Sequence, residues 1–313
     1  MSPGLTRVGF IVGPTGAGKS ALAIEVATRL GAEIVNADSR QVYRGMNLGT
    51  AKPSAAERRG VAHHLIDIRS PAEPLDVATF TTLARAAIEQ IATRGRHPIV
   101  VGGSGLYLRA LRGGIFRGPA ASREIRERLE RAARDHGVSH LHQRLREIDP
   151  AAARRIGVND LYRITRAIEV WELTGEPISS HQARHGFANR SYDCLTLGIS
   201  MDRAELYAAI DRRFDEMIGQ GLVEEVRSLL AAGYRADRPP LGSIGYQQIA
   251  AHLRGEMGLA EAVEIAKRES RRFAKRQLTW FRADPEIVWL DRNGAAKQAG
   301  KLLGDFFADS SAT

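Results

Sequence analysis

Residues 8–24 read VGFIVGPTGAGKSALAI, which predicts a buried strand, a glycine-rich turn and a helix in that order. The turn fits the pattern G-x-x-x-x-G-K-[ST] of a phosphate-binding P-loop. Its glycines allow the backbone to curl so that N–H groups point at an anion, and the helix adds the positive end of its dipole. We therefore expect a di- or triphosphate to be bound by Gly13, Pro14, Thr15, Gly16, Ala17, Gly18, Lys19 and Ser20.

Two side chains of this turn indicate how the phosphates are held. Lys19 can reach the terminal phosphate, and the Ser20 hydroxyl can hold Mg²⁺, which is the expected cofactor and has Ser20 as its expected metal ligand. The alternative is a glycine-rich turn that binds nothing. The pattern alone identifies neither the phosphate compound nor the bond that breaks.

Strands and helices alternate on both sides of residues 121–187, which predicts an α/β fold with a P-loop NTPase-like parallel sheet and flanking helices. Strands are expected at residues 8–12, 33–36, 64–68, 98–101, 195–200 and 286–290. Helices are expected at residues 19–30, 78–93, 204–220, 222–232 and 259–280, with a turn at 242–246 and a polar tail at 308–313.

Residues 121–187 contain helical patterns at 122–136, 138–148 and 160–174 and no convincing strand. We therefore expect three segments. Residues 1–120 form the first part of the P-loop core, residues 121–187 an all-helical insertion, and residues 188–313 the second part of the core with a basic C-terminal helix.

The composition favours an acidic partner. The 313 residues include 45 Lys and Arg against 36 Asp and Glu, a formal net charge of +9 that suits nucleic acid, although a basic enzyme with a solvated surface is the alternative.

The single cysteine, Cys194, excludes an intrachain disulfide and leaves a cysteine zinc site unsupported. Without a signal peptide or a long apolar run, we expect a cytoplasmic protein with no membrane partner, and nothing demands more than a monomer.

Three polar positions are expected near the P-loop. Asp38 follows the second strand at the edge where parallel sheets bind ligands, so it could support Mg²⁺ or accept a proton from a nucleophile. A loop cap without a chemical role is the alternative for Asp38. Ser104, in the turn at residues 102–105, could bond a ligand, although these glycines could serve turn geometry alone. Arg213 could clamp a leaving phosphate or lie on the surface.

The last long helix carries basic residues at spacings of four, which form two adjacent stripes. They are Lys267, Arg268, Arg271, Arg272, Lys275 and Arg276, interleaved with Phe273, Trp280 and Phe281. Basic side chains beside aromatic rings suit an RNA backbone with unstacked bases, whereas a solvated helix face is the alternative. Arg163 and Arg166 could add a second line of contact. His63 and His64 are expected to be packing or loop residues, not metal ligands.

Longer stretches carry a family resemblance along most of the chain. They are GPTGAGKS from Gly13, NADSRQVYRGMNLGTAKP from Asn36, HHLIDI from His63, VGGSGLYLRAL from Val101, NDLYRITRAIEVWELTGEP from Asn159, GLVEEV from Gly221, GYQQ from Gly245 and SRRFAKRQLTWFR from Ser270. In sequence and order they resemble the bacterial tRNA dimethylallyltransferase family, also called tRNA isopentenyltransferase. Departures from the family pattern are small: Gly16-Ala17 replaces a common Ala-Ser pair, and Ser104 and Ser270 stand where threonine is usual.

The resemblance implies transfer of a dimethylallyl group from dimethylallyl diphosphate to N6 of the adenosine 3′-adjacent to the tRNA anticodon. Lys19 and Arg213 would then hold the leaving diphosphate, Asp38 would accept the N6 proton, and the insertion would grip the anticodon stem-loop. The resemblance also implies tRNA contacts at Asp38, Ser39, Arg40, Gln41, Ser104, Arg126, Tyr162, Arg163, Ile164, Thr165, Arg166, Gly242, Ser243, Ile244, Gly245, Tyr246, Gln247, Ser270, Arg271, Arg272, Phe273, Ala274, Lys275, Arg276 and Gln277.

Three other functions remain compatible with a P-loop. An ATP-dependent small-molecule kinase shares the loop and could use the insertion as a lid. An adenylate isopentenyltransferase would act on free nucleotide and would not need the basic helix. A nucleotide-gated RNA-binding protein would not need Asp38.

Overall fold

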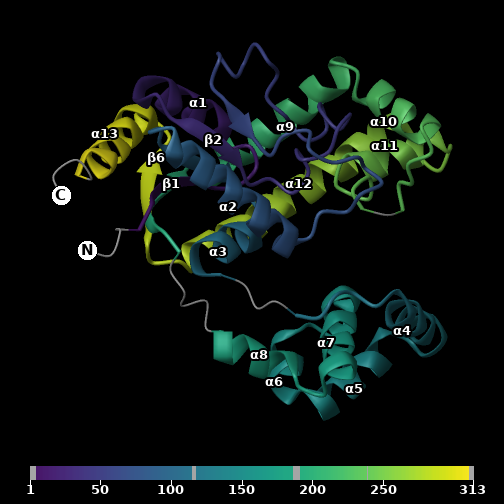
Figure 1. The fold of residues 1–313 in the computed structure, drawn as a ribbon. Coiled ribbons are helices and arrows are strands. Elements are labelled where there is room, and N and C mark those ends of the chain that lie inside the picture. Colours follow the sequence, from purple (N-terminus) through teal and green to yellow (C-terminus); the bar gives the residue numbers. More distant parts are fainter. Residues whose placement is uncertain (1–4, 115–117, 186–190, 238, 310–313) are drawn as a thin grey trace. The chain divides into compact units, whose positions relative to one another are not determined.

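A six-stranded sheet forms the centre of the larger part of the chain (Figure 1). Its strands are β1 (Arg7–Val12), β2 (Glu33–Asn36), β3 (His63–His64), β4 (Pro98–Gly102), β5 (Asp193–Ser200) and β6 (Ile287–Asp291), and their spatial order is β3-β2-β4-β1-β5-β6. Every pair is parallel, and Gly9 of β1 lies opposite Ile99 of β4 and Leu195 of β5. The expected α/β class and parallel sheet are confirmed.

The computed structural model describes residues 5–114, 118–185, 191–237 and 239–309. They divide into two compact units, a sheet unit of Met1–Arg112 with Ser191–Thr313 and a helical unit of Gly113–Arg190. Among these described residues, no helix is both long and apolar enough to span a bilayer.

Helices cover both faces of the sheet because successive strand residues point to opposite sides. Phe10 of β1 packs in one hydrophobic cluster with the helices α2 and α3, while Ile11 packs in the other with α1 and α13. Figure 1 shows α1 beside α13, and the two helices are in contact. The helices of this unit are α1 (Lys19–Leu30), α2 (Val77–Thr93), α3 (Gly105–Gly113), α9 (Arg203–Gly219), α10 (Leu222–Ala231), α11 (Tyr246–Leu253), α12 (Leu259–Arg282) and α13 (Ala295–Ala308).

The prediction of a strand at residues 64–68 is wrong. The strand β3 ends at His64 because Leu65 and Asp67 have φ angles of 62° and 56°, which lie in the left-handed region and break an extended chain. The helix α13 was not predicted, because glycines and small side chains obscure its helical pattern. The helix α11 was not predicted either, and only a turn was expected where it begins.

The helical unit has a hydrophobic core of its own, built from residues such as Leu129, Leu145 and Ile168. Its helices are α4 (Arg123–His136), α5 (Val138–Ile148), α6 (Pro150–Arg155), α7 (Leu161–Thr174) and α8 (Ile178–His185). The helices at α4, α5 and α7 match the expected positions, whereas the short α6 and α8 were not expected. Residues 186 and 187, the end of the expected insertion, lie outside the described part of the chain.

Candidate active site

The P-loop joins the end of β1 to the start of α1. Gly16 and Gly18 have φ angles of 85° and 88°, so the turn requires backbone conformations that glycine adopts without strain. The N-cap of α1 is Gly18, which provides no side-chain cap for the first backbone N–H groups of the helix. A Cβ atom on Gly16 would lie only 2.7 Å from Cγ1 of Ile210 in α9. The curled loop therefore presents helix N–H groups, as anion binding requires.

Two cations and one carboxylate gather at this loop. Lys19 Nζ donates a hydrogen bond of 2.8 Å to the Pro14 carbonyl oxygen, and Arg213 Nη2 donates one of 2.6 Å to Thr15 Oγ1. Burial lowers the pKa of Lys19 to about 8; the charge of Asp38 opposes this shift and that of Arg213 adds to it. Burial likewise lowers the pKa of Arg213, against the opposing charge of Asp38. Arg213 therefore lies at the loop, not on the open surface.

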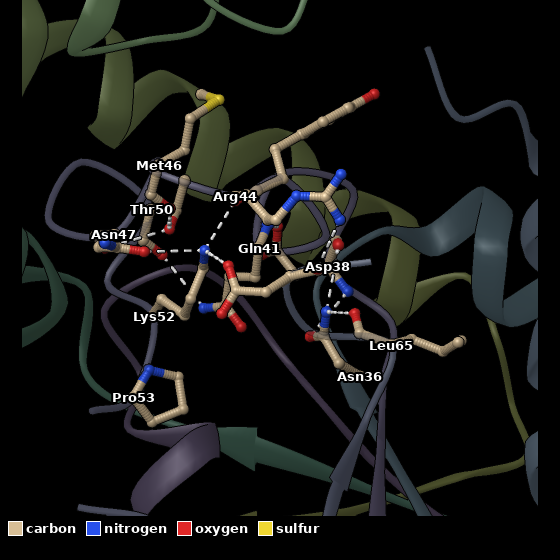
Figure 2. Close-up of polar contacts among 12 residues, drawn as sticks. Asn36, Asp38, Gln41, Arg44, Met46, Asn47, Thr50, Lys52, Pro53 and Leu65 are labelled. Atoms are coloured by element: carbon tan, nitrogen blue, oxygen red, sulfur yellow. Dashed lines mark hydrogen bonds and ion pairs between the residues drawn. The ribbon is translucent and has the colours of Figure 1, made fainter. Parts of the chain in front are cut away.

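Hydrogen bonds to nearby residues fix the position of Asp38 after β2 (Figure 2). Asn36 Oδ1 accepts the Asp38 N–H at 3.2 Å, and Asn36 Nδ2 donates to the Leu65 carbonyl oxygen at 3.0 Å. Asp38 Oδ1 in turn accepts the N–H groups of Arg40 at 2.8 Å and Gln41 at 3.4 Å. The Asp38 carboxylate therefore caps the loop, which was the alternative role considered for it, but these two hydrogen bonds use only Oδ1.

Protein atoms pack closely against the glycines at residues 102, 103 and 105. Cβ atoms on Gly102, Gly103 and Gly105 would each lie 2.3 Å from another atom, respectively the Ala37 carbonyl oxygen, Gln277 Nε2 and Trp280 Nε1. Because these three glycines have no side chain, the loop after β2 and the helix α12 can approach the turn closely. Ser104 Oγ accepts the N–H of Ser39 at 3.2 Å, which joins this turn to the segment that contains Asp38.

Lys52 joins the segment between β2 and β3 to the turn after β3, a role that sequence reasoning missed. Its side chain is only 3% exposed, and Nζ donates to the Tyr43 carbonyl oxygen at 2.7 Å, Asn47 Oδ1 at 2.9 Å and Asp67 Oδ1 at 2.5 Å (Figure 2). Asp67 is thereby assigned a structural contact. The motif in which Lys52 lies gave no signal of this role, because the contacts depend on how the segment folds back on itself and on Asp67 of a later turn.

Glu225 of α10 fixes the same loop from the other side. Its carboxylate accepts the backbone N–H groups of Asn47 at 3.1 Å, Leu48 at 2.8 Å and Gly49 at 3.2 Å, and the Tyr246 hydroxyl at 2.6 Å. One carboxylate thus satisfies four donors, which makes it the main polar anchor of residues 47–49.

Replacing Glu225 by Ala should lower the free energy of unfolding by about 2–3 kcal/mol, because the N–H groups of residues 47–49 and the Tyr246 hydroxyl lose this carboxylate as an acceptor. Chemical denaturation measures the change. The matched control is Glu224→Ala, which removes the adjacent exposed carboxylate that pairs with Arg227. Equal stability of the two variants would show that the Glu225 contacts contribute nothing.

Several residues that the resemblance assigns to tRNA contact are buried. In the protein alone they lie in hydrophobic cores or in contacts between loops, so their direct contact with RNA stays a prediction. They are Gln41, Ile164, Thr165, Gly245, Tyr246, Ala274 and Gln277. Gln41, for example, donates through Nε2 to the carbonyl oxygens of Thr50 and Ala51, at 3.1 Å each. The sequence could not reveal this burial because the same segments also carry exposed residues.

Ion pairs within the protein hold five of the arginines that the resemblance assigns to tRNA, which are Arg126, Arg163, Arg166, Arg271 and Arg272. Arg126 and Arg166 both bind Glu169, whose carboxylate is fully buried, with contacts of 2.8 and 2.6 Å. Arg271 binds both carboxylate oxygens of Asp211 at 2.6 and 2.7 Å. Arg163 and Arg272 pair with Asp160 at 3.5 Å and Glu269 at 2.7 Å, and all five side chains stay partly exposed, so their contacts with tRNA stay predictions.

The other residues of that assignment are exposed or half-buried. They are Asp38, Ser39, Arg40, Ser104, Tyr162, Gly242, Ser243, Ile244, Gln247, Ser270, Phe273, Lys275 and Arg276. The basic surface of α12 is narrower than two full stripes, because Lys267 pairs with Asp215 at 2.7 Å. Arg276 lies 5.8 Å from the Phe273 ring centroid, so a cation and an aromatic ring share the exposed face.

The two adjacent histidines make protein contacts. His64 Nε2 lies 2.7 Å from Glu33 Oε2, and His63 Nδ1 lies 2.8 Å from the Val61 carbonyl oxygen. Within the described part of the chain, no group of three or more His, Cys, Asp or Glu side chains could hold a metal ion. A metal at this site would therefore depend on the substrate for most of its ligands.

A parallel sheet with a P-loop, two cations and a facing carboxylate defines a phosphate-binding α/β protein of the P-loop class. Residues 41–284 match the model of the IPP transferase family. The chain belongs to this family.

Relatives and solved structures agree with this assignment. The chain is 52% identical over 289 residues to the tRNA dimethylallyltransferase of Geobacter metallireducens, covering 92% of this chain and 94% of that protein. It resembles the tRNA isopentenylpyrophosphate transferase structure of Bacillus halodurans with a TM-score of 0.72 and 39% identity over 98% of both chains. A eukaryotic dimethylallyltransferase acting on tRNA gives a TM-score of 0.80 at 27% identity, over 97% of this chain and 80% of that one.

Proposed function

We propose that this protein transfers a dimethylallyl group from dimethylallyl diphosphate to N6 of the adenosine 3′-adjacent to the tRNA anticodon and releases diphosphate. The observation that carries the proposal is the meeting of Lys19, Arg213 and Asp38 at one phosphate loop. A kinase would also use the two cations, but it would not account for the relatives, which are named as tRNA dimethylallyltransferases.

The proposed reaction forms a bond between N6 and C1 of the donor and breaks the bond between C1 and the diphosphate oxygen. An exocyclic amine is a weak nucleophile, so C1–O cleavage runs ahead of N6–C1 formation and leaves positive charge on the allyl group. The loop N–H groups, Lys19 and Arg213 stabilise the charge that develops on the diphosphate. Asp38, whose second oxygen is not used by the cap, takes the proton that N6 loses.

The residues present fit Mg²⁺ as the cofactor. Ser20 supplies a half-buried hydroxyl at the start of α1, next to Lys19. Protein sites for Mg²⁺ commonly use one or two protein oxygens together with phosphate oxygens, which agrees with the lack of a three-ligand cluster among the described residues. When bound, Mg²⁺ would neutralise part of the diphosphate charge.

The proposed tRNA surface consists of exposed side chains on two separate helices. On α12 these are Arg272, Phe273, Lys275 and Arg276, and on α7 of the helical unit they include Tyr162, whose exposed fraction is 74%. Basic groups bind phosphates, and rings stack on bases that have left their helix. Unstacking the target adenine costs roughly a few kcal/mol, which such contacts would offset.

Replacing both Arg272 and Arg276 by Ala should weaken tRNA binding and reduce the slope of log affinity against log salt, because two phosphate contacts are lost. Binding titrations at several salt concentrations measure both effects. The matched control is Lys297→Ala with Lys301→Ala, which removes two exposed charges at the same spacing from α13. An unchanged salt slope in the Arg272 and Arg276 variant would place this face away from the RNA.

One assay separates the proposal from its rivals. Labelled dimethylallyl diphosphate and Mg²⁺ are incubated with tRNA or with AMP, and ATP hydrolysis is followed in parallel. Label on tRNA alone supports the proposal, whereas label on AMP indicates an adenylate isopentenyltransferase. ATP turnover without label transfer indicates a kinase, and tRNA binding without either reaction indicates an RNA-binding protein.

A further inference from the structure

Gln277 of α12 lies buried between the two glycine-rich turns of the site. Its Oε1 accepts the backbone N–H of Thr15 at 2.8 Å, and its Nε2 donates to the Gly103 carbonyl oxygen at 2.9 Å. Both partners are backbone groups of fixed polarity, so only one orientation of the side-chain amide satisfies them. Gln277 therefore connects three segments that are far apart in the sequence.

The packing around this amide is tight. A Cβ atom on Gly103 would lie 2.3 Å from Gln277 Nε2 and 3.3 Å from the Gly13 carbonyl oxygen. The two turns are thus close to each other where the amide joins them. A shorter side chain at residue 277 could not reach both turns in this arrangement.

Thr15 links Gln277 to Arg213, because it forms a hydrogen bond with each of them. The Thr15 hydroxyl accepts the hydrogen bond from Arg213 Nη2 at 2.6 Å, while the Thr15 N–H is occupied by Gln277. The Thr15 N–H therefore does not belong to the set of loop donors that face the anion. By holding the Thr15 backbone, Gln277 sets the direction of the hydroxyl that orients the Arg213 guanidinium.

We propose that Gln277 is a positioning residue for the diphosphate site, acting through Thr15 on Arg213, and is not a tRNA contact. This inference rests on the proposed function, because it assigns Arg213 to the diphosphate. Glutamine is the side chain that supplies an acceptor and a donor at this length. Glutamate lacks the donor, asparagine is shorter by one methylene, and methionine has neither group.

The test is the binding of inorganic pyrophosphate with Mg²⁺, measured by calorimetry with and without an anticodon stem-loop RNA. Gln277→Met should weaken pyrophosphate binding by about tenfold or more, since each hydrogen bond of an oriented charged group contributes on this scale. Binding of the RNA itself should change by less than about twofold. A loss of RNA affinity with unchanged pyrophosphate affinity would overturn the inference.

A matched control distinguishes positioning from general destabilisation. Gln248 is also buried, and its Oε1 accepts the Gly245 N–H at 2.8 Å at the start of α11. Gln248→Met should lower the thermal midpoint as Gln277→Met does, yet leave pyrophosphate affinity unchanged. Equal losses of pyrophosphate affinity in both variants would indicate a structural effect only.

A double-mutant cycle tests the route through Thr15. Thr15→Val removes the hydroxyl that Arg213 binds and retains the N–H that Gln277 binds. If both act on Arg213, the loss in the double variant will be smaller than the product of the two single losses. Independent losses would overturn the proposed route. Failure of the wild-type protein to bind pyrophosphate in either condition would instead contradict the proposed function itself.

Discussion

Replacing Asp38 by Asn should leave tRNA bound and lower the rate of dimethylallyl transfer by about 10²–10⁴-fold, the usual contribution of a general base. Asparagine has the same shape, and its Oδ1 can accept the N–H groups of Arg40 and Gln41 as the carboxylate does. The loop therefore keeps its conformation, while the group that takes the N6 proton is lost. Single-turnover transfer at saturating tRNA measures the chemical step directly.

The control for this variant is Asp38→Ala, which removes the cap together with the proposed base. It should lower the free energy of unfolding by about 1 kcal/mol, whereas Asp38→Asn should not. Equal transfer rates in the wild-type protein and Asp38→Asn would assign Asp38 to loop capping alone and remove it from the chemistry.

Replacing Lys19 by Met should abolish measurable binding of the diphosphate donor and at the same time stabilise the protein in the absence of substrate. The pKa of Lys19 is lowered to about 8, so folding disfavours its charged form. This penalty is complete below pH 8 and fades as the pH rises towards the value of about 10.5 in the unfolded chain. We expect Lys19→Met to gain about 1–3 kcal/mol at pH 7 and progressively less above pH 8.

Lys52 provides the matched control, because it is a second lysine with a buried side chain. Lys52→Met leaves the Tyr43 carbonyl oxygen, Asn47 Oδ1 and Asp67 Oδ1 without their shared donor, so it should destabilise the protein. Denaturation curves of both variants at pH 7 and pH 9.5 measure the contrast. A destabilised Lys19→Met protein at pH 7 would contradict the charge balance inferred for the loop.

Local patterns predicted the parts of the fold that depend on neighbouring residues. The P-loop, α1 and the central strands follow from apolar runs and glycine spacing, and the structure places them where expected. The short β3 was misread because the conformations of Leu65 and Asp67 are fixed by surrounding loops, which a strand-like sequence does not reveal. Tertiary packing thus overrides local preference there.

The polar anchors of the site could not be predicted because their partners are distant in the sequence. Gln277 joins Thr15 and Gly103, and Glu225 binds the N–H groups near Leu48. No spacing rule connects such residues before the helices pack. For the same reason no spacing in the sequence indicates that Arg126 pairs with the buried Glu169.

The central claim is that the loop from Gly13 to Ser20 binds a diphosphate that departs by carbon–oxygen cleavage. The most direct test uses dimethylallyl diphosphate labelled with ¹⁸O in the oxygen that bridges C1 and phosphorus, followed by mass spectrometry of both products after reaction with tRNA. The account predicts that all ¹⁸O leaves in the pyrophosphate and that the modified adenosine gains five carbons without oxygen. Retention of ¹⁸O in the organic product would contradict it, because phosphorus–oxygen cleavage would then be the reaction.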